Sequence, residues 1–224
     1  MIVPGVFMVG GPGMSDPADC LVYAVDGRAE IALIDCGAGK DVGSILGNME
    51  KAGLDQARLK TLILTHCHVD HIGGLPGILK HCSPRLVCHR GDVDAIETGD
   101  DSRTAASWYG LRLPSVKVDL VLEGEEEIIR VGEADLRCIH TPGHTPGSIS
   151  VLLETEAGRV LFGQDIHGPF LQEFGSDPEQ WAASMRRLLA LEPDVLCEGH
   201  FGIFRPWDEV NRFITGYLRQ HGFR

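Results

Sequence analysis

The sequence predicts an α/β (α+β) protein in which two β-sheets pack face to face and helices cover their outer faces, a four-layer αββα sandwich. Two sets of short apolar runs predict the sheets, and amphipathic helices accompany each set. The chain has 224 residues, 43% of them hydrophobic and 23% charged, which is typical of a globular protein with a substantial core. We therefore expect a single domain over residues 1–224.

The N-terminal half begins with strands. Short apolar runs separated by Gly, Pro and Asp predict three of them, at 6–10, 20–25 and 30–35. Residues 41–52 carry apolar side chains at the 3.6-residue period of an amphipathic helix, which ends before Gly53. The run Leu62-Ile63-Leu64 then predicts a strand that is buried on both faces.

The C-terminal half repeats this pattern. Further apolar runs predict four strands, near 127–131, 134–140, 148–153 and 159–163. A helix over about 178–190, a strand at 194–197 and a helix over about 206–219 follow. The stretch 91–118 between the two halves is the least regular, and we expect a loop there that lies over a site.

Charge and composition restrict the partners. Acidic residues outnumber basic ones by 32 to 20, and the net charge of −12 disfavours nucleic acid as a partner. No apolar run approaches the roughly 20 residues that span a bilayer, and the first residues lack the basic region of a secretory signal. We expect a cytoplasmic protein that acts on a small molecule and binds neither nucleic acid nor membrane. No interface stripe indicates a particular oligomeric state.

A run of metal-ligating side chains follows the strand at 62–64. Four of the six residues from His66 to His71 carry an imidazole or a carboxylate. Alternate residues of an extended segment share a face, so His66 and His68 can converge on one metal ion. Asp70 and His71 lie at the turn into the next helix and can reach a second ion.

A metal site needs three or four protein ligands, so other parts of the chain must contribute. Three candidates lie in loops after predicted strands. His144 stands between two of them, Asp165 follows the run at 159–163, and His200 follows the strand at 194–197. One edge of a two-sheet sandwich can gather all three.

These residues resemble the metallo-β-lactamase superfamily and, within it, the glyoxalase II-like (hydroxyacylglutathione hydrolase-like) hydrolases. Five motifs stand in the family's order: LIDCG at 33–37, THCHVDHIGG at 65–74, TPGHTPGS at 141–148, FGQD at 162–165 and EGH at 198–200. The resemblance spans nearly the whole chain. It implies one αββα domain of the metallo-β-lactamase type, with its site at one edge of the two sheets.

The resemblance also implies a site for two divalent metal ions. His66, His68 and His144 would hold the first ion, Asp70, His71 and His200 the second, and Asp165 both. Zinc is the expected metal, with iron and manganese as alternatives, because His and Asp ligands accept several divalent ions. Asp70 and Asp165 are the expected catalytic residues. Asp35 is expected to accept the remaining N–H of a ligand imidazole.

A pair of divalent ions lowers the pKa of a shared water toward about 7 and polarises the carbonyl under attack. We therefore expect a metal-dependent hydrolase that cleaves a small-molecule thioester, ester or lactone. Only residues 201–224 follow the last ligand, whereas glyoxalase II carries a helical C-terminal glutathione domain, so acylglutathione specificity is not expected. One alternative is an oxidoreductase with a single iron that resembles persulfide dioxygenases. Another is a binding or regulatory protein on the same scaffold.

Other residues near the motifs have weaker signals. Cys67 lies between two candidate ligands, but its side chain should point to the opposite face and pack there. His167, two residues after Asp165, is a candidate for the substrate pocket, and Trp108 and Tyr109 are candidates for lid residues. The remaining histidines have no partner pattern and are expected at the surface or in the core: His81, His89, His140 and His221.

Overall fold

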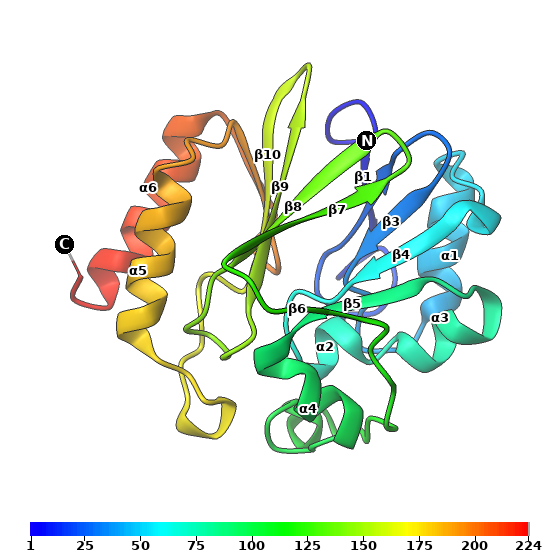
Figure 1. The fold of residues 1–224 in the computed structure, drawn as a ribbon, viewed down its shortest axis with the longest axis horizontal. Helices are drawn as coiled ribbons and strands as arrows, with labels where there is room; N and C mark the ends of the chain where they lie inside the picture. The colour runs from blue at the N-terminus through cyan, green and yellow to red at the C-terminus, as the bar shows by residue number, and fades with distance from the viewer. Residues whose placement is uncertain (224) are drawn as a thin grey trace.

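The computed structural model describes residues 1–223 as two six-stranded β-sheets packed face to face, with helices on both outer faces (Figure 1). This four-layer arrangement confirms the predicted αββα fold class. Within residues 1–223, no helix combines the length and the apolar character needed to span a bilayer.

The strands of the first sheet lie side by side in chain order. They are β1 (Val6–Gly10), β2 (Val22–Asp26), β3 (Ile31–Ile34), β4 (Leu59–Ile63), β5 (Arg85–His89) and β6 (Leu120–Leu122). The first three are antiparallel neighbours, whereas β3 to β6 pair in parallel. Parallel pairing needs crossover connections. These connections carry α1 (Val42–Lys51), the 3-10 helix Gln56–Arg58, α2 (Val69–Ile72), α3 (Leu75–His81) and α4 (Arg90–Thr98).

The second sheet is mostly an antiparallel meander. Its strands are β7 (Glu126–Val131), β8 (Ala134–His140), β9 (Ile149–Thr155), β10 (Gly158–Gln164), β11 (Val195–Glu198) and β12 (Ile203–Phe204). Only β10 and β11 pair in parallel. Between them lie the 3-10 helix Gln172–Phe174 and α5 (Pro178–Leu189), and α6 (Trp207–Gln220) follows β12 and lies beside α5 (Figure 1).

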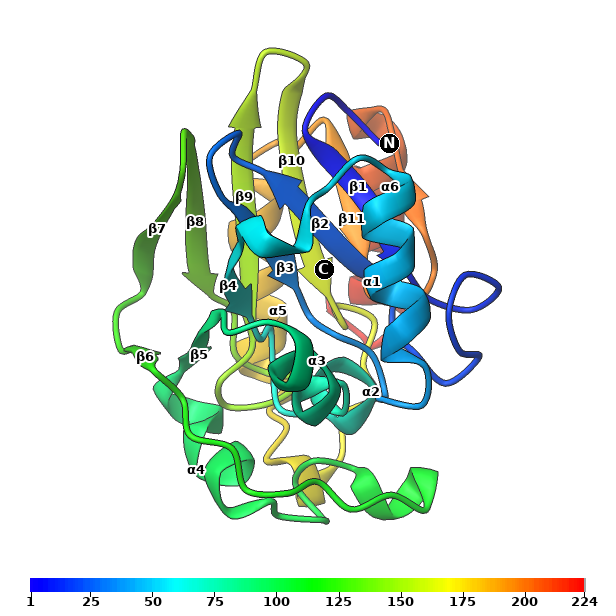
Figure 2. The same ribbon diagram turned by 90° about the vertical axis from the view of Figure 1, so that its right-hand side faces the viewer.

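Three apolar layers hold the sandwich together. Side chains alternate along β3, so that Leu33 packs with Ile45 of α1 while Ile34 faces the second sheet. The middle layer joins Ile34 to Phe162 of β10. The outer layer on the other side is centred on Trp181 of α5. In Figure 2, α1 and α3 lie in front of the first sheet. Burial of both faces explains why the central strands are continuous apolar runs.

The predicted strands and helices are found, with one correction in the stretch 91–118. That stretch was expected to be irregular, but its first residues continue α4. Val93 and Ile96 pack into the core beneath that helix. Two large apolar side chains are too few to reveal a 3.6-residue period, which is why the sequence does not predict this helix. Beyond Gly99 the stretch is a long connection with one short 3-10 helix, Ala106–Tyr109.

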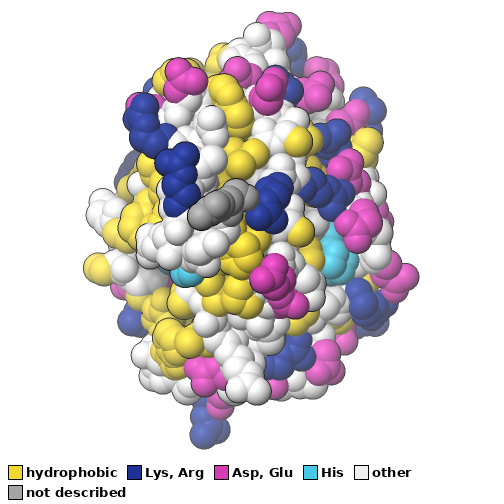
Figure 3. All heavy atoms as spheres, turned by 90° about the vertical axis from the view of Figure 1, so that its left-hand side faces the viewer, with side chains coloured by type: hydrophobic (Ala, Val, Ile, Leu, Met, Phe, Trp, Pro, Cys, Tyr) yellow, Lys and Arg dark blue, Asp and Glu magenta, His cyan; other side chains and the backbone are white. Residues whose placement is uncertain are grey.

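Charged side chains of both signs are interspersed on the face that α5 and α6 form (Figure 3). Arg187 of α5, for example, pairs with Glu125 and Glu126 at the start of β7. The expectation that nucleic acid is not a partner stays a prediction.

Two histidines that had no predicted partner form a stacked pair where β5 and β8 end. The rings of His89 and His140 lie 3.7 Å apart at an angle of 16°. His89 Nδ1 accepts a hydrogen bond from the N–H of Gly91 and caps α4, while His140 Nε2 donates to the carbonyl of Pro146. Burial, followed by the nearby His140, lowers the pKa of His89 to about 4. The fold therefore favours the neutral form of His89.

We expect His89→Asn to make unfolding less sensitive to acid. Because the pKa of folded His89 lies below its ordinary value of about 6.5, its contribution to stability is complete above pH 6.5 and is lost as the pH falls toward 4. Asn keeps an acceptor that can cap α4 but does not titrate. Between about pH 7 and 4.5, the Tm of this variant should fall less than that of the wild type. The control His81→Asn, exposed on α3, should follow the wild type; equal falls in all three proteins would contradict the prediction.

Candidate metal centre

The histidine and aspartate motif lies at the edge of the sandwich where β4 ends. His66 and His68 occupy the extended segment between β4 and α2, and Asp70 and His71 lie on α2 itself. Successive side chains of this segment point to opposite sides, so Cys67 points away from His66 and His68. Its thiol donates to the carbonyl of Arg103. Cys67 belongs to none of the clusters of side chains that could hold a metal ion.

Three segments of the second sheet complete the cluster. His144 lies in the connection between β8 and β9, Asp165 directly follows β10, and His200 follows β11. All except the half-buried His200 are shielded from solvent. The structure thus brings together all seven residues of the predicted ligand set, from two sheets and five separate elements or connections.

The seven side chains form two groups that share Asp165. Within each group, one ligand atom from every residue lies within 4.8 Å of the others. Asp165 Oδ1 is 3.1 Å from His71 Nε2 and 3.2 Å from His200 Nε2, whereas Oδ2 faces His144 Nε2 at 3.7 Å. The first group is His66, His68, His144 and Asp165, and the second is Asp70, His71, Asp165 and His200.

Unpartnered polar atoms show that these residues fit a metal ion. His66 Nε2 and His68 Nε2 are buried and have no hydrogen-bond partner. A buried polar atom without a partner costs free energy, so such atoms are rare unless something binds them. Imidazole nitrogens and carboxylate oxygens are ligands of zinc and of other divalent metals. The cluster therefore indicates a site for divalent metal.

The two groups differ in their charge. Burial lowers the pKa of His66, and lowers the pKa values of His68 and His144 to about 3, so these rings are neutral, which is the form that binds metal. Burial also opposes a charge on His200, but the carboxylates of Asp165 and Asp70 outweigh it and raise the pKa of His200 to about 10. An ion at the second group must therefore displace protons, which one at the first group need not do.

Neighbouring acceptors fix the orientation of two ligand rings. Asp35 Oδ2 lies 2.8 Å from His71 Nδ1, and the same carboxylate accepts the backbone N–H and the hydroxyl of Thr65. His144 Nδ1 donates to the carbonyl of Pro169 at 2.9 Å. Both contacts leave Nε2 for a metal. Cys20 also lies near His71, but burial raises the pKa of its thiol to about 12, so it stays protonated and is a poor ligand.

Asp92, which the sequence analysis missed, ties the two ligand-bearing loops together. It is completely buried at the start of α4. Its carboxylate accepts the N–H of Cys67 at 2.9 Å, the N–H of Gly147 at 2.8 Å and the hydroxyl of Thr145 at 2.6 Å. It therefore holds the loop of His66 and His68 against the loop of His144, although no local motif marks it.

A chamber of about 190 Å³ opens onto the metal cluster. Two connections wall it, one with Trp108 and Tyr109 and the other with Pro169 and Phe174. The ring of Trp108 lies 5.1 Å from that of Phe174, which in turn lies 4.3 Å from the ring of His68. His167 also lines the chamber. The structure thus places the three residues singled out beside the motifs at the site.

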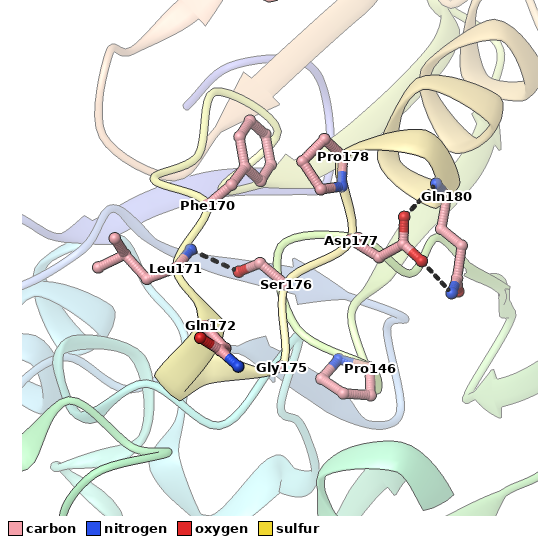
Figure 4. Close-up of a pocket in the computed structure, with 10 residues that line it drawn as sticks. Pro146, Phe170, Leu171, Gln172, Gly175, Ser176, Asp177, Pro178 and Gln180 are labelled. Atoms are coloured by element: carbon pink, nitrogen blue, oxygen red, sulfur yellow. Dashed lines mark hydrogen bonds between the residues drawn. The ribbon is translucent and has the colours of Figure 1, made fainter.

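Pro169 and Phe174 of the second connection line the chamber, and neighbouring residues of this connection line a larger outer cavity of about 510 Å³ (Figure 4). Phe170, Leu171 and Ser176 face this outer cavity. The hydroxyl of Ser176 accepts the N–H of Leu171 and donates to the carbonyl of His144 at 2.6 Å. The connection is therefore anchored to a ligand residue at both of its ends, through Pro169 and through Ser176.

A comparison with known protein families shows which family this chain belongs to. The family model described as the metallo-beta-lactamase superfamily matches residues 15–200. The chain belongs to the metallo-β-lactamase superfamily. With its cluster of histidine and aspartate ligands, it is a metallohydrolase of that superfamily.

Individual members of the superfamily agree with this assignment. A probable metallo-hydrolase, YflN of Bacillus subtilis, is 30% identical over 200 residues, which cover 75% of this chain and 74% of that protein. The human acyl-coenzyme A thioesterase MBLAC2 is 26% identical over 232 residues, which cover 90% of this chain and 79% of that protein. A mutant metallo-β-lactamase from Cronobacter sakazakii shares the fold, with a TM-score of 0.82 at 19% identity over 99% of this chain and 94% of that one.

We expect Asp35→Asn to weaken metal binding by about 10- to 100-fold, because the amide holds the ring of His71 less firmly. Competition with a chromophoric chelator measures the affinity, and the Tm of the metal-free variant reports whether it folds. Asp135→Asn, which changes an exposed carboxylate on β8, serves as the control. Wild-type affinity in the folded Asp35→Asn protein would contradict the role of Asp35.

We expect Asp92→Asn to lower the free energy of unfolding by about 2 to 4 kcal/mol. The carboxylate accepts hydrogen bonds from three donors, and the NH₂ group of Asn would face at least one of these donors without being able to accept from it. Urea denaturation measures the change. Asp94→Asn, on an exposed position of the same helix, should stay within about 0.5 kcal/mol of the wild type. Similar losses in the two variants would show that Asp92 has no special structural role.

Proposed function

We propose that the protein is a dinuclear metallohydrolase that cleaves a small-molecule thioester, ester or lactone. The position of Asp165 carries this proposal, because its two carboxylate oxygens face different groups of imidazoles. His66, His68 and His144 would hold one divalent ion, and Asp70, His71 and His200 the other. Zinc is the metal that we expect first, since His-rich sites with one or two carboxylates suit it.

When bound, two such ions supply a hydroxide at neutral pH and polarise the carbonyl under attack. The chain's own residues set the charge of the site. Asp70 and Asp165 offset two of the four positive charges that a pair of divalent ions carries, so the site stays positive and favours an anion. Negative charge develops on the carbonyl oxygen during acyl cleavage, and a positive, shielded site stabilises it.

The walls of the chamber suit a short acyl group. The chamber beside the cluster has a volume of about 190 Å³, which accommodates a short acyl chain. Trp108 and Phe174 form an apolar surface on which that group can lie. The similarity to the thioesterase MBLAC2 supports testing thioesters first. The five motifs support a closer kinship with glyoxalase II-like hydrolases. A cytoplasmic location is a separate part of the same proposal.

Metal analysis and a substrate panel test this proposal. We expect two zinc ions per chain in the protein purified with zinc, and hydrolysis of short acyl thioesters or esters. Asp165→Asn should lose at least one ion, and its kcat/KM should fall by more than about a hundredfold. The control Asp135→Asn should keep both ions and full activity.

Other outcomes would overturn the proposal in favour of the alternatives. One iron per chain together with oxygen consumption on a glutathione persulfide would point to a mononuclear oxidoreductase. Two bound ions without turnover of any thioester, ester or lactone would point to a binding or regulatory protein.

A further inference from the structure

One imidazole in the chamber belongs to neither ligand group. His167 lines the chamber together with His68, Asp165 and His200. Ile166, which precedes it, points the other way into the core beside Trp181. Asp165 and His167 therefore lie on the same side of the chain and face the same chamber.

A completely buried carboxylate holds the ring of His167. Glu198, the last residue of β11, lies with its Oε1 atom 2.6 Å from His167 Nδ1. Its Oε2 atom accepts the backbone N–H groups of His200 and Phe201 at 2.7 and 2.8 Å. Three donors thus satisfy a carboxylate that is shut off from water, as a buried charge requires.

These contacts assign the two ring nitrogens of His167. Oε2 of Glu198 already accepts two backbone N–H groups, and Oε1, 2.6 Å from Nδ1 of His167, is the acceptor left for the ring. Nδ1 of His167 must therefore donate the proton in this hydrogen bond, and Nε2 is the ring atom left for another partner.

Aromatic neighbours restrict the rotation of the ring. Phe201 packs edge-on against it at 4.8 Å, and His200 does so at 5.4 Å. Tyr217 of α6 lies 6.1 Å away. The imidazole is thus held in one orientation before any ligand arrives, which is what a residue that orients a substrate needs.

We propose that His167 contacts the substrate through Nε2 and that Glu198 is the residue that positions it. The reaction itself is that of the proposed function, on which this inference rests. A hydroxyl on the acyl group can donate to Nε2, whereas a purely hydrocarbon acyl group offers this nitrogen no partner. The site therefore selects acyl compounds that carry a hydroxyl or similar polar group near the scissile carbonyl.

A matched pair of thioesters tests this selection. The probes are the butanoyl and 3-hydroxybutanoyl thioesters of N-acetylcysteamine, which differ by one hydroxyl group. We expect the zinc-loaded wild type to prefer the hydroxylated thioester by about tenfold or more in kcat/KM. His167→Asn keeps a donor for Glu198 but lacks Nε2, so it should lose this preference while retaining its metal content and Tm.

Further variants separate a substrate contact from a structural role. His167→Gln, whose amide reaches further than that of Asn, should recover part of the preference. Glu198→Gln should weaken the preference without touching the substrate, and His81→Asn should leave it unchanged. Long-range ¹H–¹⁵N spectra of the zinc-loaded protein report which ring nitrogen carries the proton. The signals of the His167 ring, assigned by their absence in His167→Asn, should show the proton on Nδ1.

Binding distinguishes this inference from the proposed function. If the wild type hydrolyses none of the thioesters, esters and lactones of the panel, the hydrolase proposal fails, but tryptophan fluorescence still measures how 3-hydroxybutanoate and butanoate bind to the zinc-loaded protein. The wild type should then favour the hydroxylated acid about tenfold, and His167→Asn should bind both equally. The same preference in wild type and His167→Asn, in turnover or in binding, would overturn the inference.

Discussion

The carboxylate of Asp165 is buried where the two sheets meet, and the rest of the site is arranged around it. Burial alone would raise its pKa, but His71 and His200 outweigh that effect and hold the pKa well below its usual range. One oxygen faces His71, which follows β4 of the first sheet, and the other faces His144 of the second. The charge of Asp165 is thus buried against imidazoles that come from both sheets, as a buried charge requires.

Three further carboxylates, all buried, position the site from behind. Asp35, Asp92 and Glu198 each accept at least one backbone N–H, and two of them also hold an imidazole. They lie among the 32 acidic residues whose surplus gives the chain its net charge of −12. That surplus therefore does not describe the surface alone. Part of it acts inside as a set of acceptors that fix loops and ring orientations, which is how ligand geometry is made rigid.

The layers and the ligand cluster could be predicted because both leave dense local patterns. Buried strands are continuous apolar runs, and the motif from His66 to His71 concentrates four ligating side chains in six residues. The supporting contacts leave no such pattern. Asp92 meets Gly147 across 55 positions of sequence, and Glu198 meets His167 across 31. Only the tertiary fold pairs them, just as it pairs His89 with His140, and α4 has too few apolar residues to show a period.

The metal cluster and the chamber walls lie on different kinds of segment, and this difference affects how such enzymes diversify. The residues of the metal cluster lie at strand ends and in short connections that the buried carboxylates hold in place. The chamber walls that carry Trp108 and Phe174 belong instead to two longer connections, one between α4 and β6 and the other between β10 and α5. Insertions are tolerated in surface connections far better than in packed elements. A lineage can therefore exchange one substrate for another by lengthening these two segments, while its hydrolytic centre is inherited unchanged.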